Sequence, residues 1–184
     1  AEEIRFIRER EADLSAISAC LADGSLPLRV THNDTKLNNI LFDAVTGKGI
    51  CVIDLDTVMP GSALYDFGDA IRFGASTGAE DEKDLDQISC SLELFEAYTR
   101  GYLKGCDGSL TEQEIHMLPM GAKLMTLECG MRFLTDYLQG DTYFRIHREE
   151  HNLDRARTQF KLVRDMEEKW EEMVKIVERV RESD

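Results

Sequence analysis

The chain has 184 residues, of which 36 are acidic and 22 are basic, and its formal net charge at pH 7 is −14. A hydrophobic content of 42% in a chain of this length is enough for one sizeable core, so we expect a single compact unit. The acidic balance argues against a nucleic-acid partner, because the phosphates of a nucleic acid require a basic surface.

Residues 1–22 are predicted to form one helix, because their apolar side chains fall roughly on one face and Gly24 follows as a stop signal. A short strand is expected at residues 28–31. Beyond it, two β-prone segments, residues 39–43 and 50–54, flank a glycine-containing turn and are typical of a hairpin.

The hairpin predicts where two polar residues lie. If its strands are symmetric about the turn, residue 43 faces residue 50 and Asn39 faces Asp54. Opposed residues of an antiparallel pair project from the same face, so Asn39 and Asp54 are expected to point together beyond the open end of the hairpin. Their oxygen atoms suit Mg²⁺ when phosphate oxygens complete its coordination.

A polar loop lies between the short strand and the hairpin. His32, Asp34 and Asn39 match the spacing of the H-R-D-x-x-x-x-N loop of protein kinases, and Asp54 takes the place of their further metal-binding Asp. Asp34 is placed to accept the proton of a substrate hydroxyl while Asn39 and Asp54 hold the metal. The order of these residues predicts a site for phosphoryl transfer.

A second candidate for the metal-binding Asp lies in the triplet Asp66-Phe67-Gly68, which spells the D-F-G of protein kinases. Asp54 directly ends the second hairpin strand, whereas Asp66 falls well beyond it, so position favours Asp54. Residues 65–73 are predicted to begin a helix, in which Asp66 is a capping or loop-bracing carboxylate.

The rest of the chain is predicted to be helical. An acidic loop over residues 74–84 precedes a helix over residues 86–104. A capping box at Thr111 opens another helix, which Pro119 interrupts or kinks. Residues 153–182 show a continuous amphipathic pattern and predict one long helix. The predicted fold class is therefore mostly α with a small β-hairpin (α+β).

Several segments resemble the aminoglycoside phosphotransferase and choline kinase superfamily. They are residues 32–39, 53–57 and 65–69 for the superfamily, and residues 132–138, 143–144 and 151–159 for its N-acetylhexosamine 1-kinase branch. The resemblance implies that residues 1–184 form the C-terminal lobe of a protein-kinase-like fold. It also implies phosphorylation of the anomeric hydroxyl of an N-acetylhexosamine sugar, with ATP as co-substrate and Mg²⁺ as cofactor.

The same resemblance assigns roles to individual residues. It implies that Asp34 is the catalytic base and that Asn39 and Asp54 bind the metal and, through it, the nucleotide. Lys36 matches the spacing of the catalytic-loop lysine of protein serine/threonine kinases and would offset charge on the transferring phosphoryl group. Three further residues match positions that line the sugar site: Thr57, Arg132 and Tyr143.

One part of the kinase pattern is absent from the sequence. Such enzymes need a β-rich N-terminal lobe with a glycine-rich cover over the phosphates and a strand lysine. The only G-x-G here is Gly47-Lys48-Gly49, which falls in the hairpin turn. We therefore expect the chain to be one lobe of a longer protein and to turn over ATP poorly by itself.

Two short motifs offer competing interpretations. The segment from His147 to His151 matches the zinc signature H-x-x-E-H, but it is more simply a polar linker that leads into a helix. The segment Ser25-x-Pro27-x-Arg29 matches the core of a sulfatase motif. The longer sulfatase pattern does not continue, and sulfatases need a carboxylate-rich metal site on a large α/β fold, so a sulfatase-related fragment is a remote alternative.

Within the kinase interpretation, choline, homoserine and aminoglycosides stay open as acceptors. A non-catalytic pseudokinase module is disfavoured because Asp34, Asn39 and Asp54 are all retained. No run of about 18 apolar residues and no signal-peptide pattern occurs, so we expect no membrane span and no secretion. The five cysteines are scattered and odd in number, which predicts reduced thiols and a cytoplasmic protein.

Overall fold

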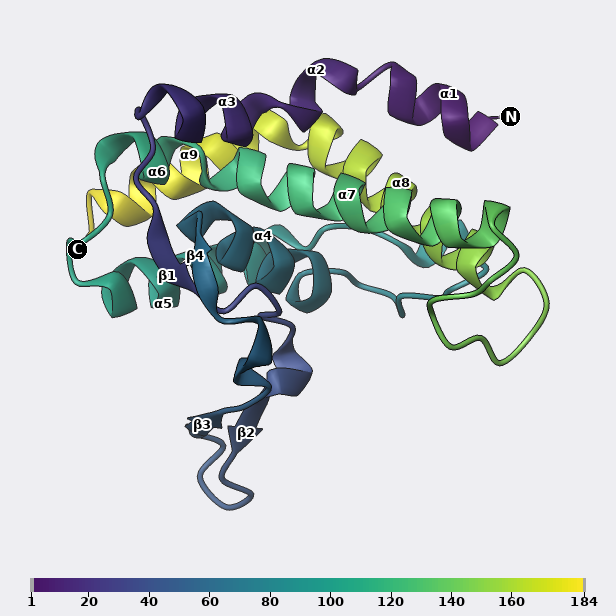
Figure 1. The fold of residues 1–184 in the computed structure, drawn as a ribbon. Coiled ribbons are helices and arrows are strands. Elements are labelled where there is room, and N and C mark those ends of the chain that lie inside the picture. Colours follow the sequence, from purple (N-terminus) through teal and green to yellow (C-terminus); the bar gives the residue numbers. More distant parts are fainter. Residues whose placement is uncertain (1, 184) are drawn as a thin grey trace.

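The computed structural model describes residues 2–183, which form a helical body from which a small hairpin projects (Figure 1). The elements are α1 (Glu2–Arg8), α2 (Glu11–Leu14), α3 (Ala16–Asp23), β1 (Arg29–Thr31), η1 (Leu37–Asn39), β2 (Ile40–Phe42), β3 (Gly49–Val52), η2 (Leu55–Thr57), β4 (Met59–Gly61), α4 (Ala63–Gly74), η3 (Leu85–Gln87), α5 (Leu92–Cys106), α6 (Glu112–His116), α7 (Leu118–Leu138), α8 (His151–Glu168) and α9 (Trp170–Arg181). Within this range the strands form two antiparallel pairs, β1–β4 and β2–β3. No helix among these residues is long and apolar enough to cross a membrane.

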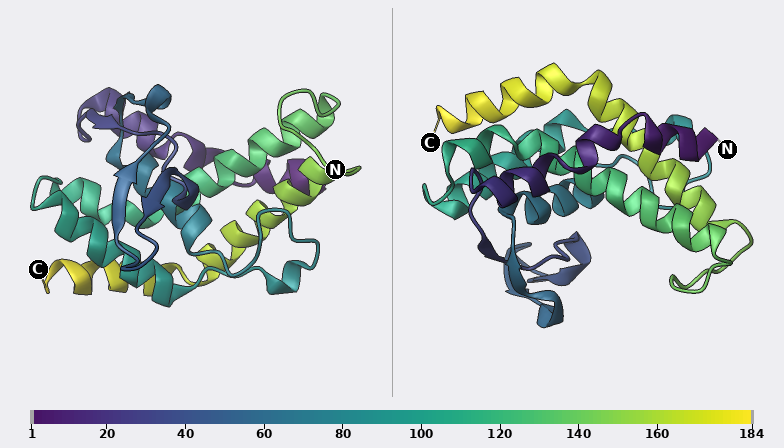
Figure 2. Two further views of the ribbon diagram at one scale, coloured as in Figure 1. Left: turned by 90° about the horizontal axis from the view of Figure 1, so that it is seen from below. Right: turned by 45° about the horizontal axis from the view of Figure 1, so that its top comes forward.

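The long helix α7 is the centre of the body and packs against both α4 and α8 (Figures 1 and 2). One group of buried apolar side chains joins α4, α5 and α9 to α7 and includes Phe67, Phe95 and Met173. A second group joins α1 and α8 to α7 and includes Phe6 and Phe160. Each large side chain buried in this way stabilises the fold by about 1.5–3 kcal/mol.

The helices α4 and α7 cross at two glycines. A Cβ atom added at Gly68 would overlap the carbonyl oxygen of Gly121. A Cβ added at Gly121 would lie 2.6 Å from the carbonyl oxygen of Leu64, which is closer than real Cβ contacts come. The two backbones therefore approach as closely as they do because neither position carries a side chain.

The prediction of one helix over residues 1–22 is wrong, because the segment divides into α1, α2 and α3. At the first break, Arg10 Nη1 donates to the carbonyl oxygen of Phe6 (2.9 Å), which ends α1. The same guanidinium donates to both carboxylate oxygens of Glu167 on α8 (2.9 and 2.6 Å). A contact with a distant residue thus ends the helix, while Gly24 closes α3 in the left-handed conformation as expected (φ 80°).

The hairpin forms, but the predicted register is wrong by one residue. Ile40 faces Val52, so Asn39 lies opposite residue 53 and Asp54 follows one position later. The reason lies in the turn: Asp43 bonds through its backbone N–H to the carbonyl of Lys48 (2.8 Å), and its carboxylate accepts the N–H of Thr46 (2.7 Å). This tight turn changes which residues of the two strands face each other, and a β-bulge between Leu41 and Phe42 accommodates one extra residue.

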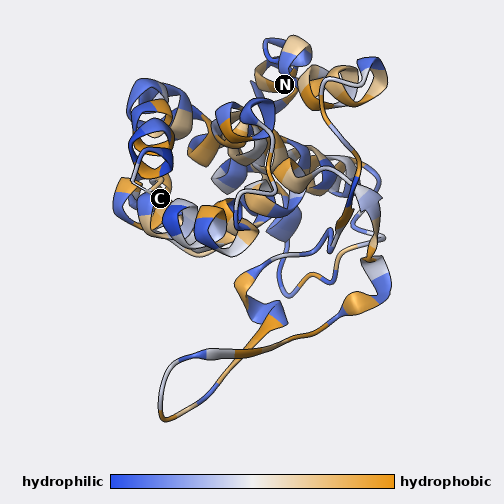
Figure 3. Cartoon of the chain, turned by 90° about the vertical axis from the view of Figure 1, so that its left-hand side faces the viewer, coloured by the Kyte–Doolittle hydropathy of each residue, from blue (hydrophilic) through white to orange (hydrophobic). Residues whose placement is uncertain are grey.

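The hairpin is also unusually exposed. Its strands extend away from the helical body, and residues of high hydropathy occur along both of them (Figure 3). The exposed fractions of Phe42, Ile50 and Val52 are 49%, 66% and 52%. The hairpin is therefore held chiefly by its own pairing and by its base near η1.

Two later helices differ from the predicted ranges. The helix predicted over 86–104 begins at Leu92, because the side chain of Ser91 accepts the N–H of Leu94 (3.3 Å) as an N-cap. The long helix predicted over 153–182 is broken at Lys169 into α8 and α9. The Lys169 ammonium donates to Ser89 Oγ (2.6 Å) and to the carbonyl of Cys90 (2.9 Å), so a tertiary contact again places the break.

Other local predictions are confirmed. The strand at 28–31 forms as β1, although its partner β4 was not foreseen. The capping box of Thr111 and Glu114 is present with both reciprocal hydrogen bonds. Pro119 lies in the first turn of α7, just after α6 ends. A proline is tolerated there because the first backbone N–H groups of a helix have no partner within it. All five cysteines are free thiols.

Candidate active site

The loop that carries Asp34 is held by contacts with α4 and η2. The carboxylate of Asp66 accepts the backbone N–H groups of His32 (2.8 Å) and Asn33 (2.7 Å). From η2, the hydroxyl of Thr57 donates to the carbonyl of His32 (2.7 Å). Asp66 is thus a loop-bracing carboxylate, as the sequence predicted.

Asp34 is the centre of this loop's polar contacts. Its Oδ2 accepts hydrogen bonds from Lys36 Nζ (2.9 Å) and from Asn39 Nδ2 (2.8 Å), and Asn39 Nδ2 also donates to the Asp34 carbonyl (2.8 Å). Partial burial acts to raise the pKa of Asp34, but the hydrogen bonds from Lys36 and Asn39 outweigh it and lower that pKa below its usual value. The hydrogen bond to Asp34 in turn raises the pKa of Lys36. The carboxylate is therefore ionised and ready to accept a proton.

The other predicted metal ligand, Asp54, lies at the base of the hairpin. It adopts a left-handed conformation (φ 64°) directly after β3, and the neighbouring N–H of Ile53 donates to the carbonyl of Asn39 (2.9 Å). The hydrogen bond with Asp56 and the charges of Asp56 and Asp34 raise the pKa of Asp54, because they add negative charge around an already acidic group. A bound cation would relieve this repulsion.

The oxygen atoms of Asn39 and Asp54 are of the kind that Mg²⁺ binds. Asn39 uses its Nδ2 toward Asp34, and its Oδ1 makes no hydrogen bond within residues 2–183, so that oxygen and the Asp54 carboxylate are available to a hard cation. Among these residues no group of three or more His, Cys, Asp or Glu side chains could hold a metal. Phosphate oxygens and water would have to complete the coordination, as in nucleotide-dependent sites.

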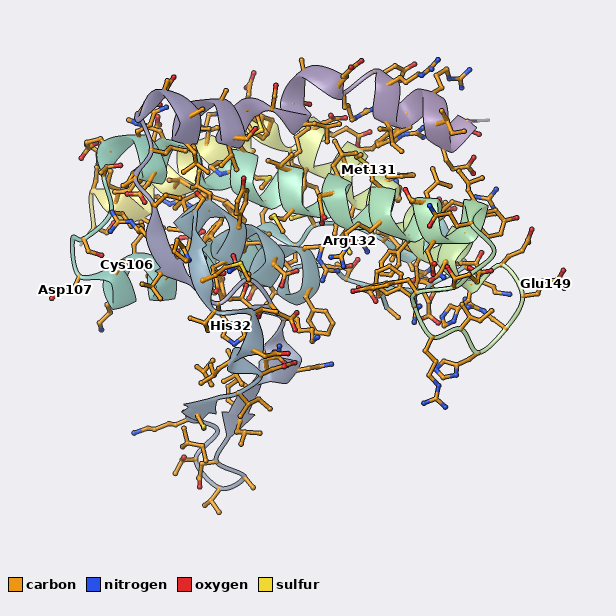
Figure 4. The ribbon with its side chains drawn as sticks, viewed as in Figure 1. His32, Cys106, Asp107, Met131, Arg132 and Glu149 are labelled. Atoms are coloured by element: carbon orange, nitrogen blue, oxygen red, sulfur yellow. The ribbon has the colours of Figure 1, made fainter. Side chains whose placement is uncertain are left out.

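A cleft of about 550 Å³ opens beside Asp34, and it lies between the loop that carries Asp34, α7 and the loop that follows α7. Asp34, Lys36 and Thr57 line it on one side, and Arg132 and Tyr143 line it on the other. Figure 4 shows Arg132 between the catalytic loop, marked by His32, and the loop after α7, marked by Glu149. The structure thus brings five of the predicted site residues to one cleft, while Asn39 and Asp54 stand outside its lining.

The far wall of the cleft is built on an aromatic pair. The rings of Phe133 and Phe144 lie 4.8 Å apart between centroids, and the Arg132 guanidinium lies 5.5 Å from the Phe144 ring and 6.0 Å from the Tyr143 ring. Asp136 holds the loop in place, since its carboxylate accepts the N–H groups of Thr142, Tyr143 and Phe144 at 2.9, 2.8 and 2.9 Å. Tyr143 itself is 74% exposed.

Some cleft residues escaped the sequence prediction. Asp69 and Arg72 are both buried on α4, form an ion pair (2.9 Å), and line the cleft together with Glu80, which also pairs with Arg72 (2.7 Å). The spacing of Asp69 and Arg72 on one helix could have indicated the pair. Arg145 and Arg155 also line the cleft. Nothing in their local sequence marks them.

The zinc and sulfatase interpretations gain no support. His151 begins α8, and both its ring nitrogens are occupied: Nδ1 accepts the N–H of His147 (3.1 Å), and Nε2 lies 2.9 Å from Asp81 Oδ2. His147 precedes the helix, so the two rings do not share a helix face as a zinc signature requires. Ser25 donates to the carbonyl of Cys20 (3.2 Å) on the opposite end of β1 from Asp34.

Comparison with known families identifies the chain at a coarser level. Residues 2–105 match the phosphotransferase enzyme family, APH, and this range holds the Asp34 loop, the hairpin with Asp54 and the bracing helix α4. The match covers more than half of the 184 residues. With Asp34 held as an ionised carboxylate at the edge of a cleft, the chain belongs to the phosphotransferase enzyme family.

Proposed function

We propose that the chain carries the catalytic and acceptor-binding part of an ATP- and Mg²⁺-dependent kinase that phosphorylates the anomeric hydroxyl of an N-acetylhexosamine. One observation carries the proposal: Asp34 shares its cleft with Arg132 and Tyr143. A hydroxyl held between these groups would lie beside a carboxylate that can take its proton. We propose further that residues 1–184 are the C-terminal lobe of a kinase-like fold and that a separate lobe covers the nucleotide.

The residues would divide the work as follows. Asp34 accepts the proton of the attacking hydroxyl, and Lys36 keeps Asp34 ionised and offsets charge near the transferred group. Asn39 and Asp54 would hold Mg²⁺, which supplies positive charge to the phosphate oxygens. Arg132 and Tyr143 orient the sugar from the far wall, and orientation is the main source of rate in phosphoryl transfer.

The charge of the far wall bears on the alternative acceptors. Arg145 and Arg155 line the cleft and have no acidic partner within residues 2–183. Such a wall disfavours choline and aminoglycosides, because both carry positive charge. Homoserine is a zwitterion, so the positive charge of this wall affects its binding less. The acceptor assay tests it directly.

The test is an acceptor panel with the protein in its complete natural length. N-acetylglucosamine, N-acetylgalactosamine, choline, homoserine and an aminoglycoside are each supplied with Mg-ATP, and we expect turnover with an N-acetylhexosamine. Asp34→Asn should lower kcat/KM for the sugar by roughly 10²- to 10⁴-fold, because a general base is lost, and should leave Mg-ATP binding nearly intact. Asp23→Asn, which changes an exposed carboxylate at the end of α3 that does not line the cleft, is the matched control.

Arg132→Ala tests the acceptor side of the cleft. Loss of one charged hydrogen bond of about 1.5–3 kcal/mol should lower kcat/KM for the sugar about ten- to a hundred-fold and leave the KM for the nucleotide almost unchanged. Preference for choline or an aminoglycoside would overturn the sugar assignment and keep the kinase. Turnover by Asp34→Asn within a few-fold of the parent would remove Asp34 as the base.

A further inference from the structure

Most arginines of this acidic protein are paired with carboxylates, and two of the three exceptions among residues 2–183 line the cleft. Within residues 2–183, ion pairs with Asp or Glu engage every arginine except Arg8, Arg145 and Arg155. Arg145 and Arg155 both line the cleft beside Asp34. With 36 acidic residues in the chain, acidic partners are plentiful, so two unpaired cations on one wall call for an explanation.

Arg155 projects from α8 into a place where a cation is costly. Its Nη1 donates to two neutral oxygens, the carbonyl of Arg145 (3.3 Å) and Oδ1 of Asn152 (3.1 Å). Its Nε is buried and has no hydrogen-bond partner among the described residues. The guanidinium lies 5.4 Å from the ring of Phe133, which offsets only part of the cost of a partly buried charge without a counter-charge.

Arg132 and Arg155 lie against the two rings of the same aromatic pair, and Arg145 is the next residue after one of them. Arg155 lies against Phe133, and Arg132 lies against Phe144. Arg145 follows Phe144 directly in the loop and joins Arg155 through its backbone carbonyl. The guanidinium groups of Arg132 and Arg155 therefore flank the aromatic pair, and Arg145 lines the same cleft.

The carboxylates of the cleft do not neutralise this wall. Asp34 is bonded to Lys36 (2.9 Å), and Asp69 and Glu80 are both paired with Arg72 (2.9 and 2.7 Å). A fourth carboxylate, Glu128, lies 3.8 Å from Arg132, and both side chains are about half exposed, so this contact is weak. The lining residues include no further carboxylate, and the other titratable side chains there, apart from the cations, are Cys129, Tyr143 and His147.

We propose that the wall formed by Arg132, Arg145 and Arg155 binds an anionic oxygen group, a carboxylate or a phosphate, carried by the acceptor. The planar, forked guanidinium suits either group, because it can donate two parallel hydrogen bonds to a pair of anionic oxygens. The anion belongs to the acceptor because Arg132 stands on the wall that orients it. This inference rests on the proposed kinase function and narrows its acceptor to an acidic sugar.

The test compares acceptors that differ only in charge. The protein in its complete natural length is assayed with N-acetylglucosamine, with its 6-phosphate, with its 3-O-carboxyalkyl ether and with the uncharged amide of that ether. We expect either the phosphate or the carboxylate to exceed its neutral counterpart in kcat/KM by roughly ten-fold or more, since charge-assisted bidentate contacts are lost with the charge. The two charged sugars show which anion the wall accepts.

Variants then connect the preference to the wall. Arg155→Gln and Arg145→Gln should each reduce the ratio of kcat/KM between the charged acceptor and its neutral counterpart, and the double variant should bring that ratio close to one. Arg155→Lys should restore part of it, because a cation returns without the fork. Arg100→Gln, on the exposed face of α5 and paired with Glu96, is the matched control and should leave the ratio unchanged.

The possible results separate this inference from the proposed function. If neutral and charged sugars react equally well, or if the double variant keeps the preference, the anion site is wrong and the sugar kinase stands. If the variants raise the KM for ATP and leave the acceptor ratio unchanged, the wall binds nucleotide phosphates and the inference is also wrong. If no N-acetylhexosamine is phosphorylated, charged or neutral, the proposed function itself fails.

Discussion

At the scale of single residues, three aspartates on or near the loop that carries Asp34 have separate surroundings. Asp34 lines the cleft, and hydrogen bonds from Lys36 and Asn39 lower its pKa and keep its carboxylate ionised. Both carboxylate oxygens of Asp66 accept backbone N–H groups of the loop, so this side chain braces the loop. Asp54 is exposed and crowded by negative charge, which favours a cation. The bracing role predicted for Asp66 is confirmed, and the assignment of the metal to Asp54 stays a prediction.

The ionisation of Asp34 predicts how activity depends on pH. The pKa of Asp34 lies below its usual value, so the base stays charged and kcat/KM is kept as the pH falls, until Asp34 is protonated. Lys36→Met removes a hydrogen bond and a positive charge that lower this pKa. We expect the acid limb of the kcat/KM profile to move to higher pH in the variant.

The measurement is a pH profile of kcat/KM for the acceptor on the protein in its complete natural length. Lys175→Met, which removes an exposed lysine of α9, is the control and should not move the acid limb. An acid limb at the same pH in the Lys36 variant and the parent would show that Asp34 is not the group that titrates.

At the scale of the elements, the triplet Asp66-Phe67-Gly68 is explained by helix packing. Phe67 is fully buried against Phe95 and Tyr102, with ring centroids 6.0 and 5.2 Å away. Gly68 allows α4 to cross α7 at Gly121. Phe67 and Gly68 thus determine how α4 packs in the core, and Asp66 connects α4 to the loop that carries Asp34.

The crossing predicts opposite effects for the same substitution at two glycines. Gly68→Ala places a Cβ against the Gly121 carbonyl and 2.7 Å from Met125 Cγ, so it should lower the free energy of unfolding by about 1–3 kcal/mol. Gly101→Ala, within α5 and with no atom within 4 Å of the added Cβ, should raise it by about 0.5–1 kcal/mol. Urea denaturation followed by circular dichroism measures both.

The prediction depends on the two substitutions changing the free energy of unfolding in opposite directions. A Gly68 variant as stable as the parent would mean that α4 and α7 separate at little cost, and the bracing of the catalytic loop through Asp66 would then be loose. Loss of stability in the Gly101 variant would show that α5 does not form its regular helix in solution.

At the scale of the whole molecule, a well-packed helical body carries a hairpin with little packing of its own. α7 has buried residues along its length, whereas every residue of β3 is exposed. Elements with few buried contacts open locally, while a central helix opens only when the whole protein unfolds. The hairpin therefore belongs to the least stable part of the chain.

Native-state hydrogen exchange measures this contrast. Amides of β2 and β3 should exchange with opening free energies roughly 3 kcal/mol or more below those of the central turns of α7. The strand pair β1–β4 provides an internal comparison for the exchange of β2 and β3, because Thr31, the last residue of β1, is buried. Equal protection of the hairpin and α7 would contradict the division into body and hairpin.

The sequence by itself determined the local features of this protein. The capping box at Thr111, the stop at Gly24 and the helix break before Pro119 follow from backbone chemistry within a few residues, and all are present. The spacing of the Asp34 loop indicated phosphoryl transfer in the same way, and the family match agrees with it at the level of a phosphotransferase. Short-range rules sufficed because each feature forms within one segment.

Only the tertiary structure decided where the elements stop and what the cleft contains. Arg10 and Lys169 break predicted helices because each bonds to residues far away in the chain, and Asp43 sets the hairpin register through its turn. Arg145 and Arg155 reach the cleft of Asp34 only because α7 packs against both α4 and α8. Contacts between distant segments depend on packing of the whole core, and no periodicity within one segment encodes them.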